Sequence, residues 1–250
     1  MRKQLQVLAF AAIFGAGGVR ADSTLETDPI LDRAIAALGG EAKLKAAKAI
    51  SVKAKGTINF GGNENPFSSE FVSAGIDKCR QTFETEFGGN KVKGKTVVAA
   101  SKGWRIFGDM DSELEGEQLD NEKRNLYLRV VPFTVLPLKG KEFKLKLGTE
   151  EKIDGKPAAC IEGKGPDGKD FKIWFDKDTG LPAKLAAKTP GFMGDEAEQI
   201  ALYTNYKEMG GVKVAGKRKT SRDGEKFIEE DVTDFQLLSE IPAKAFDKPE

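Results

Sequence analysis

Paired turn residues recur along this chain at intervals that suit long β-strands. Gly or Asp-Gly pairs favour tight hairpin turns, and they occur at Gly61-Gly62, Gly88-Gly89, Asp154-Gly155, Asp167-Gly168, Gly210-Gly211 and Asp223-Gly224. Three intervals, from 154 to 167, from 167 to 180 and from 210 to 223, are 13 residues long. Such an interval leaves up to about 11 residues between turns, or roughly 36 Å of extended chain. The spacing predicts unusually long antiparallel strands in one broad meander.

The stretch from Asp170 to Leu185 is the most regular example of this design. Phe171, Ile173 and Phe175 occupy every second position, the period that places one side of a strand against a core. The segment 176–180 then supplies the Asp side chains and the glycine that a turn requires. We expect a long hairpin with one apolar face.

Other segments repeat the alternation, with polar side chains between the apolar ones. One apolar face is formed by Val52, Ala54, Ile58 and Phe60, and another by Cys79, Phe83 and Phe87. Strands that are apolar on one side only are typical of antiparallel sheets. Two further strands are expected around Gly103, where Trp104 and Ile106 share a face that we expect to be the concave, apolar one.

Three segments have the signals of helices. Asp28-Pro29 is typical of an N-cap followed by Pro at the first helical position, and Gly39-Gly40 would end that helix. A short helix is expected from Glu41 to about Lys48. Ser112 to Glu115 has the pattern of a capping box, which predicts a helix to about Val130 that Pro132 stops. No linker, repeat or low-complexity segment interrupts residues 22–250, so we expect one domain there.

The first 21 residues have the organisation of a signal peptide. Arg2 and Lys3 precede an apolar run, Leu5 to Gly18, that is shorter than the roughly 20 residues of a membrane span. Small residues before the Ala21–Asp22 bond suit a signal peptidase. We therefore expect cleavage between these two residues, and a soluble protein that is periplasmic or secreted.

Charge and residue usage exclude several classes of function. Removal of residues 1–21 leaves 37 basic and 39 acidic residues, a net charge of −2. Such a balance gives no reason to expect binding to nucleic acid or to anionic lipid headgroups. We also expect no stable membrane insertion. The chain has no histidine, which excludes Ser-His and Cys-His catalysis and imidazole metal sites. Cys79 and Cys160 could form a disulfide in an oxidising compartment or be two separately buried thiols, and the sequence leaves both open.

Two motifs suggest ligands but have simpler interpretations. Residues 89–96 match the phosphate-loop pattern, yet the β-branched residues that follow predict a strand where a phosphate site needs a helix. Asp176 and Asp178 resemble the start of a calcium loop, but position twelve would be Ala187 in place of a bidentate Glu. We interpret the first as a hairpin and the second as a turn. No metal, cofactor or catalytic constellation is expected.

Several short motifs, taken in their order along the chain, carry a family resemblance. They are Ala37-Leu38-Gly39-Gly40, Gly103-Trp104-Arg105-Ile106, Ile173 to Pro182, Tyr203 to Val214, Asp231-Val232 and Phe246-Asp247-Lys248-Pro249. Together they resemble the LolA-like superfamily, the outer-membrane lipoprotein-sorting proteins and their relatives, over nearly all of residues 22–250. The resemblance implies a mainly β (α+β) fold, in which a single large curved antiparallel sheet, an incomplete β-barrel, wraps around a few helices. It also implies an apolar cavity, which in the sorting carriers holds the acyl chains of lipoproteins.

The favoured functional hypothesis is non-enzymatic binding of a lipid, acyl chain or lipoprotein in the concave face of the sheet. We expect a monomer without cofactors, in which apolar faces line the cavity; the candidate residues are Val52, Ile58, Phe60, Phe83, Phe87, Trp104, Ile106, Phe171, Ile173 and Phe175. The alternative is an envelope module that binds a protein or polymer and has a filled core. A carboxylate-based enzyme, with Ca²⁺ or Mg²⁺ at Asp176 and Asp178, is the third hypothesis.

Overall fold

The computed structural model describes residues 23–60, 62–190, 196–242 and 244–249, and the side chains of 23–25 and 87 are not part of the description. The predicted signal peptide and its cleavage site at Ala21–Asp22 lie outside these residues.

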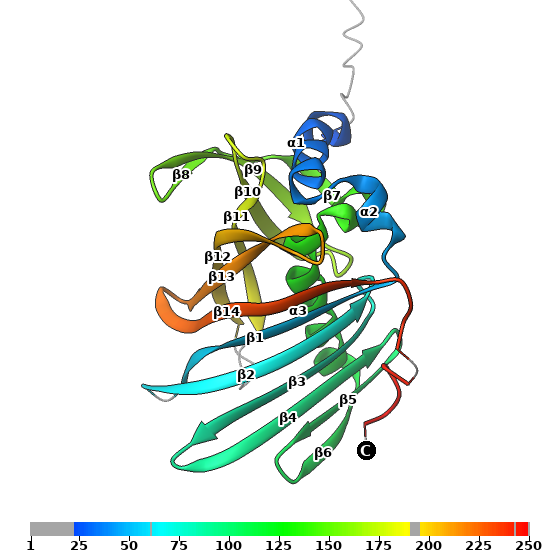
Figure 1. Ribbon diagram of the computed structural model, residues 1–250, viewed down its shortest axis with the longest axis vertical. Coiled ribbons are helices and arrows are strands. Elements are labelled where there is room, and N and C mark those ends of the chain that lie inside the picture. Colours follow the sequence, from blue (N-terminus) through cyan, green and yellow to red (C-terminus); the bar gives the residue numbers. More distant parts are fainter. Residues whose placement is uncertain (1–22, 61, 191–195, 243, 250) are drawn as a thin grey trace, which may run out of the picture.

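One antiparallel sheet of fourteen strands organises the described chain (Figure 1). Its strands are β1 (Ala49–Phe60), β2 (Asn63–Ala74), β3 (Lys78–Phe87), β4 (Asn90–Ala99), β5 (Lys102–Phe107), β6 (Met110–Leu114), β7 (Lys144–Leu147), β8 (Glu151–Ile153), β9 (Lys156–Lys164), β10 (Asp170–Asp176), β11 (Pro182–Pro190), β12 (Glu196–Met209), β13 (Val212–Arg222) and β14 (Glu225–Leu238). The order is β6-β5-β4-β3-β2-β1-β14-β13-β12-β11-β10-β9-β7, and β8 pairs with β9. The sheet does not close, since β6 and β7 at its two ends do not pair with each other. The predicted mainly β fold with one large open sheet is confirmed.

The hairpin turns explain why the strands are so long. Asp223 and Gly224 have φ angles of 48° and 84°, and Gly210 and Gly211 have 58° and 76°. Two successive residues with positive φ are typical of the type I′ turn, whose twist matches that of the strands it joins. The chain can therefore reverse in two residues, and β12 and β14 each extend over 14 residues.

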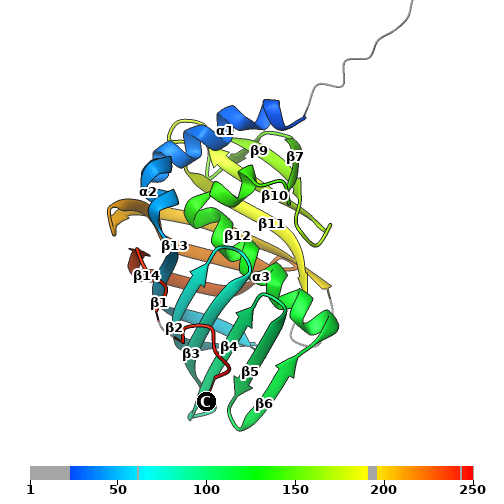
Figure 2. The same cartoon turned by 90° about the vertical axis from the view of Figure 1, so that its right-hand side faces the viewer.

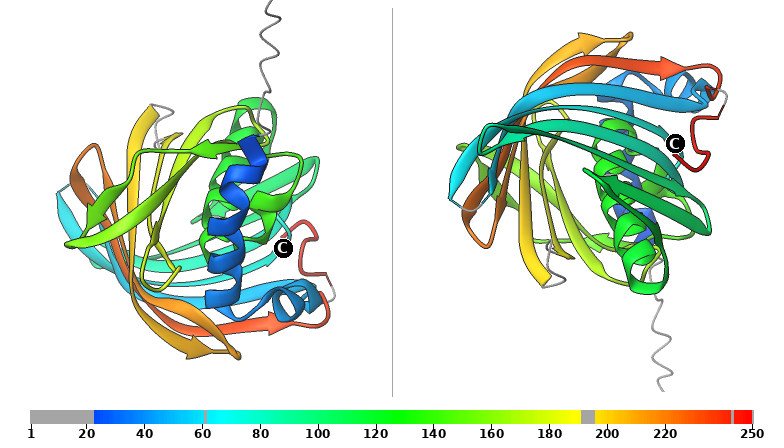
Figure 3. Two further views of the ribbon diagram at one scale, coloured as in Figure 1. Left: turned by 90° about the horizontal axis from the view of Figure 1, so that it is seen from above. Right: turned by 90° about the horizontal axis from the view of Figure 1, so that it is seen from below.

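Helices lie on the concave side of the curled sheet (Figures 2 and 3). They are α1 (Ser23–Leu38), α2 (Glu41–Ala46), α3 (Gly116–Thr134) and a 3-10 turn, η1 (Leu136–Lys139). The starts of α1 and α3 differ from the prediction. The first helix already includes residues before Asp28, so Pro29 lies inside it. Ser112 belongs to β6, where it pairs with Arg105, and α3 begins only at Gly116 without a side-chain cap.

Pro132 also lies inside α3 and does not end it. The helix ends instead where Val135 adopts a left-handed conformation, with a φ of 59°. The N–H of Val135 donates to the carbonyl of Val131, which closes the last turn. A β-branched residue at positive φ is a strained arrangement, and complete burial of the Val135 side chain holds it in place.

The main core lies between the helices and the concave face. Ile173 is fully buried and pairs with Ile161 on one side and Leu185 on the other. Because side chains alternate along a strand, Phe171 and Phe175 enter the same core and are each 2% exposed. Leu31 and Leu38 of α1 and Leu126 and Val130 of α3 pack into it from the other side. The apolar face predicted for 170–185 is confirmed.

Two smaller apolar clusters lie on the convex face. Phe246, near the C-terminus, packs against the cluster of Ala49, Val72 and Ala74. Trp174 packs with Cys160 and with Ile153 of the β8 hairpin. Cys79 is buried in the main core instead, and both cysteines are free thiols. The sequence left open whether Cys79 and Cys160 form a disulfide. They do not pair, because the sheet itself lies between the two thiols.

In the described part of the chain, no helix combines the length and the apolar character that a membrane span requires.

Candidate functional site

Four of the ten predicted lining residues lie in the packed core beneath the helices. Phe171, Ile173 and Phe175 are alternate residues of β10. Val52 on β1 pairs with Phe71 on β2 and with Phe235 on β14. Each of these four predicted side chains is 2% exposed or less. We call this part of the concave face, beneath α1 and α3, the covered region.

A second group of apolar side chains continues the concave face outside the main core. We call it the open apolar patch, and it consists of Ile58, Phe60, Phe67, Phe83, Phe107 and Ile228. The register places these residues on the same face as Val52: Ile58 pairs with Ile228, and Phe67 pairs with Gly56. All are half-buried except Phe60, which is 51% exposed. None belongs to the main core cluster.

Two phenylalanines show how the patch is built. The ring of Phe83 lies over Gly94 on β4, where an added Cβ would come within 2.1 Å of the ring. Gly94 pairs with Phe107 on β5, and the two rings lie 5.9 Å apart between centroids. A glycine on the middle strand therefore provides the space that lets aromatic side chains from β3 and β5 meet. The sequence prediction missed Phe67, Phe107 and Ile228. Phe107 follows Ile106 and Ile228 follows Phe227, so alternation alone does not assign these two residues to a face.

The prediction for Trp104 and Ile106 was wrong, because these side chains are on the convex face. Gly103 and Arg105 are the residues of β5 that face α3: Arg105 donates to Glu122, and an added Cβ on Gly103 would come within 2.9 Å of Leu119. Strand alternation then places Trp104 on the other side, where it pairs with Val97. The approach of α3 requires a small residue there, so glycine faces inward and tryptophan outward. Phe87 is the last residue of β3, and its side chain is outside the description.

A charged cluster lies on the concave face beside the open apolar patch. Arg218 on β13 donates to Glu230 on β14 at 2.8 Å, and Glu230 is 5% exposed. Arg129 of α3 places its guanidinium carbon 4.4 Å from the centre of the Phe71 ring, a cation–π contact. Tyr203 on β12 pairs with Arg218 across the strands. The sequence prediction did not single out any of these residues.

Burial dominates the electrostatics of this cluster. It lowers the pKa of Arg129 to about 10, and the positive charge of Arg218 acts in the same direction. Burial also raises the pKa of Tyr203 to about 12, so near neutral pH the arginine is charged and the phenol is neutral. Arg218 pairs with the carboxylate of Glu230, and the same carboxylate acts on Arg129 only through its charge. The environment is partly dehydrated, where unbalanced charge is costly.

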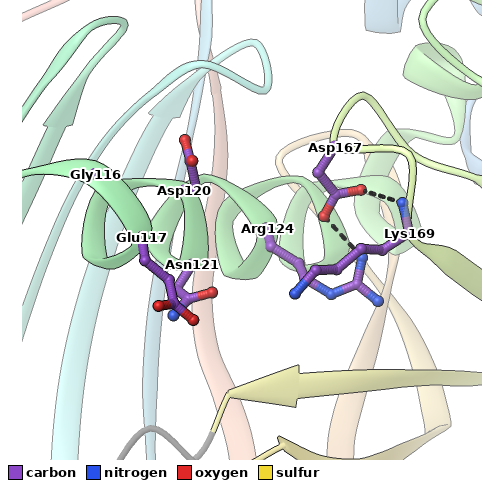
Figure 4. A pocket seen from close by; sticks show the side chains of 7 residues that line it. All are labelled: Gly116, Glu117, Asp120, Asn121, Arg124, Asp167 and Lys169. Atoms are coloured by element: carbon purple, nitrogen blue, oxygen red, sulfur yellow. Dashed lines mark hydrogen bonds and ion pairs between the residues drawn. The ribbon is translucent and has the colours of Figure 1, made fainter.

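Two hollows occur in the described part of the molecule, and the smaller one is bordered by Ile228 of the open apolar patch. The larger, of about 380 Å³, is polar and is bordered by Gly116, Glu117, Asp120, Asn121, Arg124, Asp167 and Lys169 (Figure 4). The other, of about 300 Å³, lies over β12, β13 and β14 and includes Ile200, Lys219 and Glu229. Neither is bordered by any of the ten residues that the sequence predicts to line a cavity.

Arg124 at the larger hollow has a structural role. It is 1% exposed. Its guanidinium group donates to the Tyr127 hydroxyl, the Asp167 carboxylate and the backbone carbonyls of Lys188 and Asp170. These bonds tie α3 to β10 and β11, and they leave the group well satisfied.

Residues 176–180, which resemble the start of a calcium loop, form the turn that their sequence predicts. Oδ1 of Asp176 accepts hydrogen bonds from the backbone N–H groups of Asp178 and Thr179 and from the Thr179 hydroxyl. Burial acts to raise the pKa of Asp176, but the hydrogen bonds from Thr179 and Asp178 outweigh it and lower the pKa below its ordinary value. In the described residues, no three His, Cys, Asp or Glu side chains gather as metal ligands would. Residues 89–96 likewise form a hairpin, since β4 follows the turn where a phosphate loop needs a helix.

Acidic residues give no sign of acid–base catalysis in the described part of the chain. Every carboxyl group there with a clearly changed pKa has a lowered one; lysine partners are the cause except at Asp176, where hydrogen bonds from Thr179 and Asp178 are. Hydrogen bonds from Lys172 and Lys146 lower the pKa of Glu162, and a hydrogen bond from Lys217 lowers that of Glu229. A general acid would need the opposite change.

Comparison with known proteins identifies the fold. Neither a protein-family model nor a curated protein sequence matches the chain. A solved DUF1329 family protein from Desulfovibrio piger matches with a TM-score of 0.57 and 14% identity, over 88% of this chain and 97% of that one. A LolA superfamily protein from Nitrosomonas europaea matches with a TM-score of 0.57 and 13% identity, over 89% and 97%.

A candidate outer-membrane lipoprotein-sorting domain from Vibrio parahaemolyticus matches with a TM-score of 0.52 and 12% identity, over 88% of this chain and 95% of that one. All three likenesses extend over most of both chains. The resemblance that the sequence motifs indicate is thereby confirmed at the level of the fold, which is LolA-like.

Proposed function

We propose that this protein is a non-enzymatic binder of lipids or acylated peptides, and that the acyl chain lies on the open apolar patch. The observation that supports the proposal is that six apolar side chains gather on a concave face without entering the main core. Contiguous apolar surface on a soluble domain favours a ligand or partner site. The LolA-like fold is consistent with this function, and the Vibrio domain of the same fold is a candidate lipoprotein-sorting protein.

The proposed site differs from the one predicted from the sequence. Val52, Phe171, Ile173 and Phe175 stabilise the core beneath the helices, so we assign them no contact with a ligand. Ile58, Phe60 and Phe83 remain as lining residues, and Phe67, Phe107 and Ile228 join them. This set extends over β1, β2, β3, β5 and β14, and we propose that an extended acyl chain lies on it.

The test is uptake of a fluorescent fatty acid by protein purified without detergent, combined with native mass spectrometry for lipid that co-purifies. Ile58→Ser should weaken uptake roughly tenfold, since loss of contact with an isoleucine side chain is worth about 1.5 kcal/mol. Ile106→Ser is the matched control, because Ile106 has the same side chain and is also half-buried but lies on the convex face. Absence of both co-purifying lipid and uptake would rule the proposal out.

We further propose that residues 1–21 are a signal peptide and that the protein acts in the periplasm or outside the cell, as a single domain of residues 22–250. Expression in a bacterium with an envelope, followed by mass measurement of the exported protein, tests this. The expected N-terminus is Asp22, and an unprocessed chain retained in the cytoplasm would contradict it.

A second candidate function is binding of an envelope protein or polymer. The dense packing of the covered region supports it, as does the position of both described hollows away from the predicted lining. Strand addition at an edge is the available mode, although exposed Lys144 and Lys146 on the edge strand β7 oppose it. Loss of partner binding on Lys146→Pro, with fatty-acid uptake absent in the unmodified protein, would favour this candidate.

A further inference from the structure

The charged cluster on the concave face has hydrogen-bond donors without acceptors. The Nε atoms of Arg129 and Arg218 are both buried, and neither has a hydrogen-bond partner in the described part of the chain. Glu230 pairs through one carboxylate oxygen with the Nη2 atom of Arg218, and neither Nε atom reaches this carboxylate. Buried donors in native proteins are nearly always paired, so two free donors from neighbouring arginines indicate a place for an acceptor.

The charge balance of the cluster points in the same direction. Arg129 and Arg218 carry two positive charges and Glu230 one negative charge, which leaves an excess of one positive charge. Burial and the neighbouring cation lower the pKa of Arg129, which means that its charge is unfavourable there. One bound anion would neutralise the excess and accept from the free N–H groups.

The cluster borders the open apolar patch directly. Glu230 pairs with Gly56, and the next residues on the same face of these two strands are Ile228 and Ile58, which pair with each other. Two residues along a strand span roughly 7 Å. Phe67 lies on the other side of Gly56. A ligand with its head at the arginines would therefore have its tail over Ile58, Ile228 and Phe67.

We propose that Arg129 and Arg218 bind the carboxylate of a long-chain fatty acid whose hydrocarbon tail lies on the open apolar patch. This inference rests on the proposed function and names its ligand class. A carboxylate is the smallest acyl head group with one negative charge, which is the charge that the cluster lacks. Guanidinium groups bind carboxylates through charge-assisted hydrogen bonds.

The test compares a fatty acid with the alcohol and the alkyl phosphate of the same chain length. The fatty acid should bind about tenfold more tightly than the alcohol, because a hydrogen bond to a charged group contributes to one and not to the other. Arg129→Gln should remove most of this preference while affinity for the alcohol stays within about twofold. Arg80→Gln on the convex face is the control and should keep the preference.

The outcomes of this comparison test the carboxylate site and the proposed function separately. Equal affinities for acid and alcohol would overturn the carboxylate site and leave the proposed function intact. Tighter binding of the alkyl phosphate than of the acid would assign the arginines to a phosphate head group and overturn the carboxylate. Binding of none of the three would overturn the proposed function as well. The acid–alcohol comparison uses the unmodified protein, so it stands even if Arg129→Gln does not fold.

Discussion

The covered region and the open apolar patch belong to one sheet and have the same alternation of side chains, yet they differ in what lies above them. In the covered region, side chains of α1 and α3 complete the core, and Ile173 is fully buried. In the patch, equally apolar residues such as Phe83 are only half-buried. The comparison teaches that alternation builds the face of a sheet, whereas the position of the helices decides which part of that face becomes core.

The largest effect is expected from a cavity in the covered region. Phe175→Ala should lower the free energy of unfolding by about 3–5 kcal/mol, because the side chain is 2% exposed and the surrounding core cannot collapse fully around the gap. Chemical denaturation monitored by circular dichroism measures it. Phe83→Ala in the patch is the companion variant, and its loss should be clearly smaller. Equal losses would remove the distinction between the two regions.

Removal of Arg124 should cost nearly as much, because it ties α3 over the covered region. Arg124→Met removes the donor to Oδ2 of Asp167 and to two backbone carbonyls, although Oδ1 of Asp167 still accepts from the Tyr127 hydroxyl and the Lys169 N–H. Breaking a buried ion pair costs about 3–5 kcal/mol, and partial exposure of Asp167 places this one at about 3 kcal/mol. The same denaturation experiment measures the loss. A variant with unchanged stability would show that the cover of α3 does not depend on this network.

A third prediction concerns Cys79, which lies where the covered region begins. Burial, together with the negative charge of Glu122, raises the pKa of its thiol to about 12 from an ordinary value of 9.0. A raised pKa favours the folded state below pH 9.0, and this contribution is lost as the pH rises from there towards 12. Between pH 9 and 10 the stability of the unmodified protein should therefore fall more steeply than that of Cys79→Ala, by up to about 1.4 kcal/mol per pH unit.

The companion variant is Cys160→Ala on the other side of the sheet. Burial raises the pKa of Cys160 to about 11, so between pH 9 and 10.5 this variant should also lose stability less steeply than the unmodified protein. Denaturation midpoints at pH 8, 9, 10 and 10.5 provide the slopes. If Cys79→Ala and the unmodified protein showed parallel curves, the thiol would be accessible to solvent, and the covered region would end before β3.

The strands and turns could be predicted from the sequence because their causes are local. Asp223-Gly224 fixes a hairpin by itself, and the alternation around Ile173 separates the two sides of β10. The start of α3 could not be predicted, since Ser112 has both a capping pattern and a partner strand, and pairing with Arg105 prevails. The charged cluster was also out of reach, because Arg129 and Arg218 meet only through the fold.

Local sequence patterns could not decide which side chains of β5 lie on the concave face of the sheet and which on the convex face. Alternation in β5 places Trp104 and Ile106 together but does not say on which side. The larger side chains suggested the apolar interior, whereas α3 approaches so closely that only Gly103 fits beneath Leu119. The site of a sheet protein is thus set by pairs of elements distant in the sequence, and a single strand carries only half of that information.

The smallest effect is expected from Trp104, which tests the assignment of faces most directly. Its side chain is half-buried on the convex face, opposite Val97. Trp104→Ala should therefore cost about 1–2 kcal/mol, less than the roughly 3–5 kcal/mol of a tryptophan inside a core. Affinity for the fluorescent fatty acid should stay within about twofold, whereas Phe83→Ala should lower it several-fold. Denaturation midpoint and affinity are measured on the same preparations. A large loss of affinity in Trp104→Ala would place the ligand on the convex face and reverse the assignment of the two sides of the sheet.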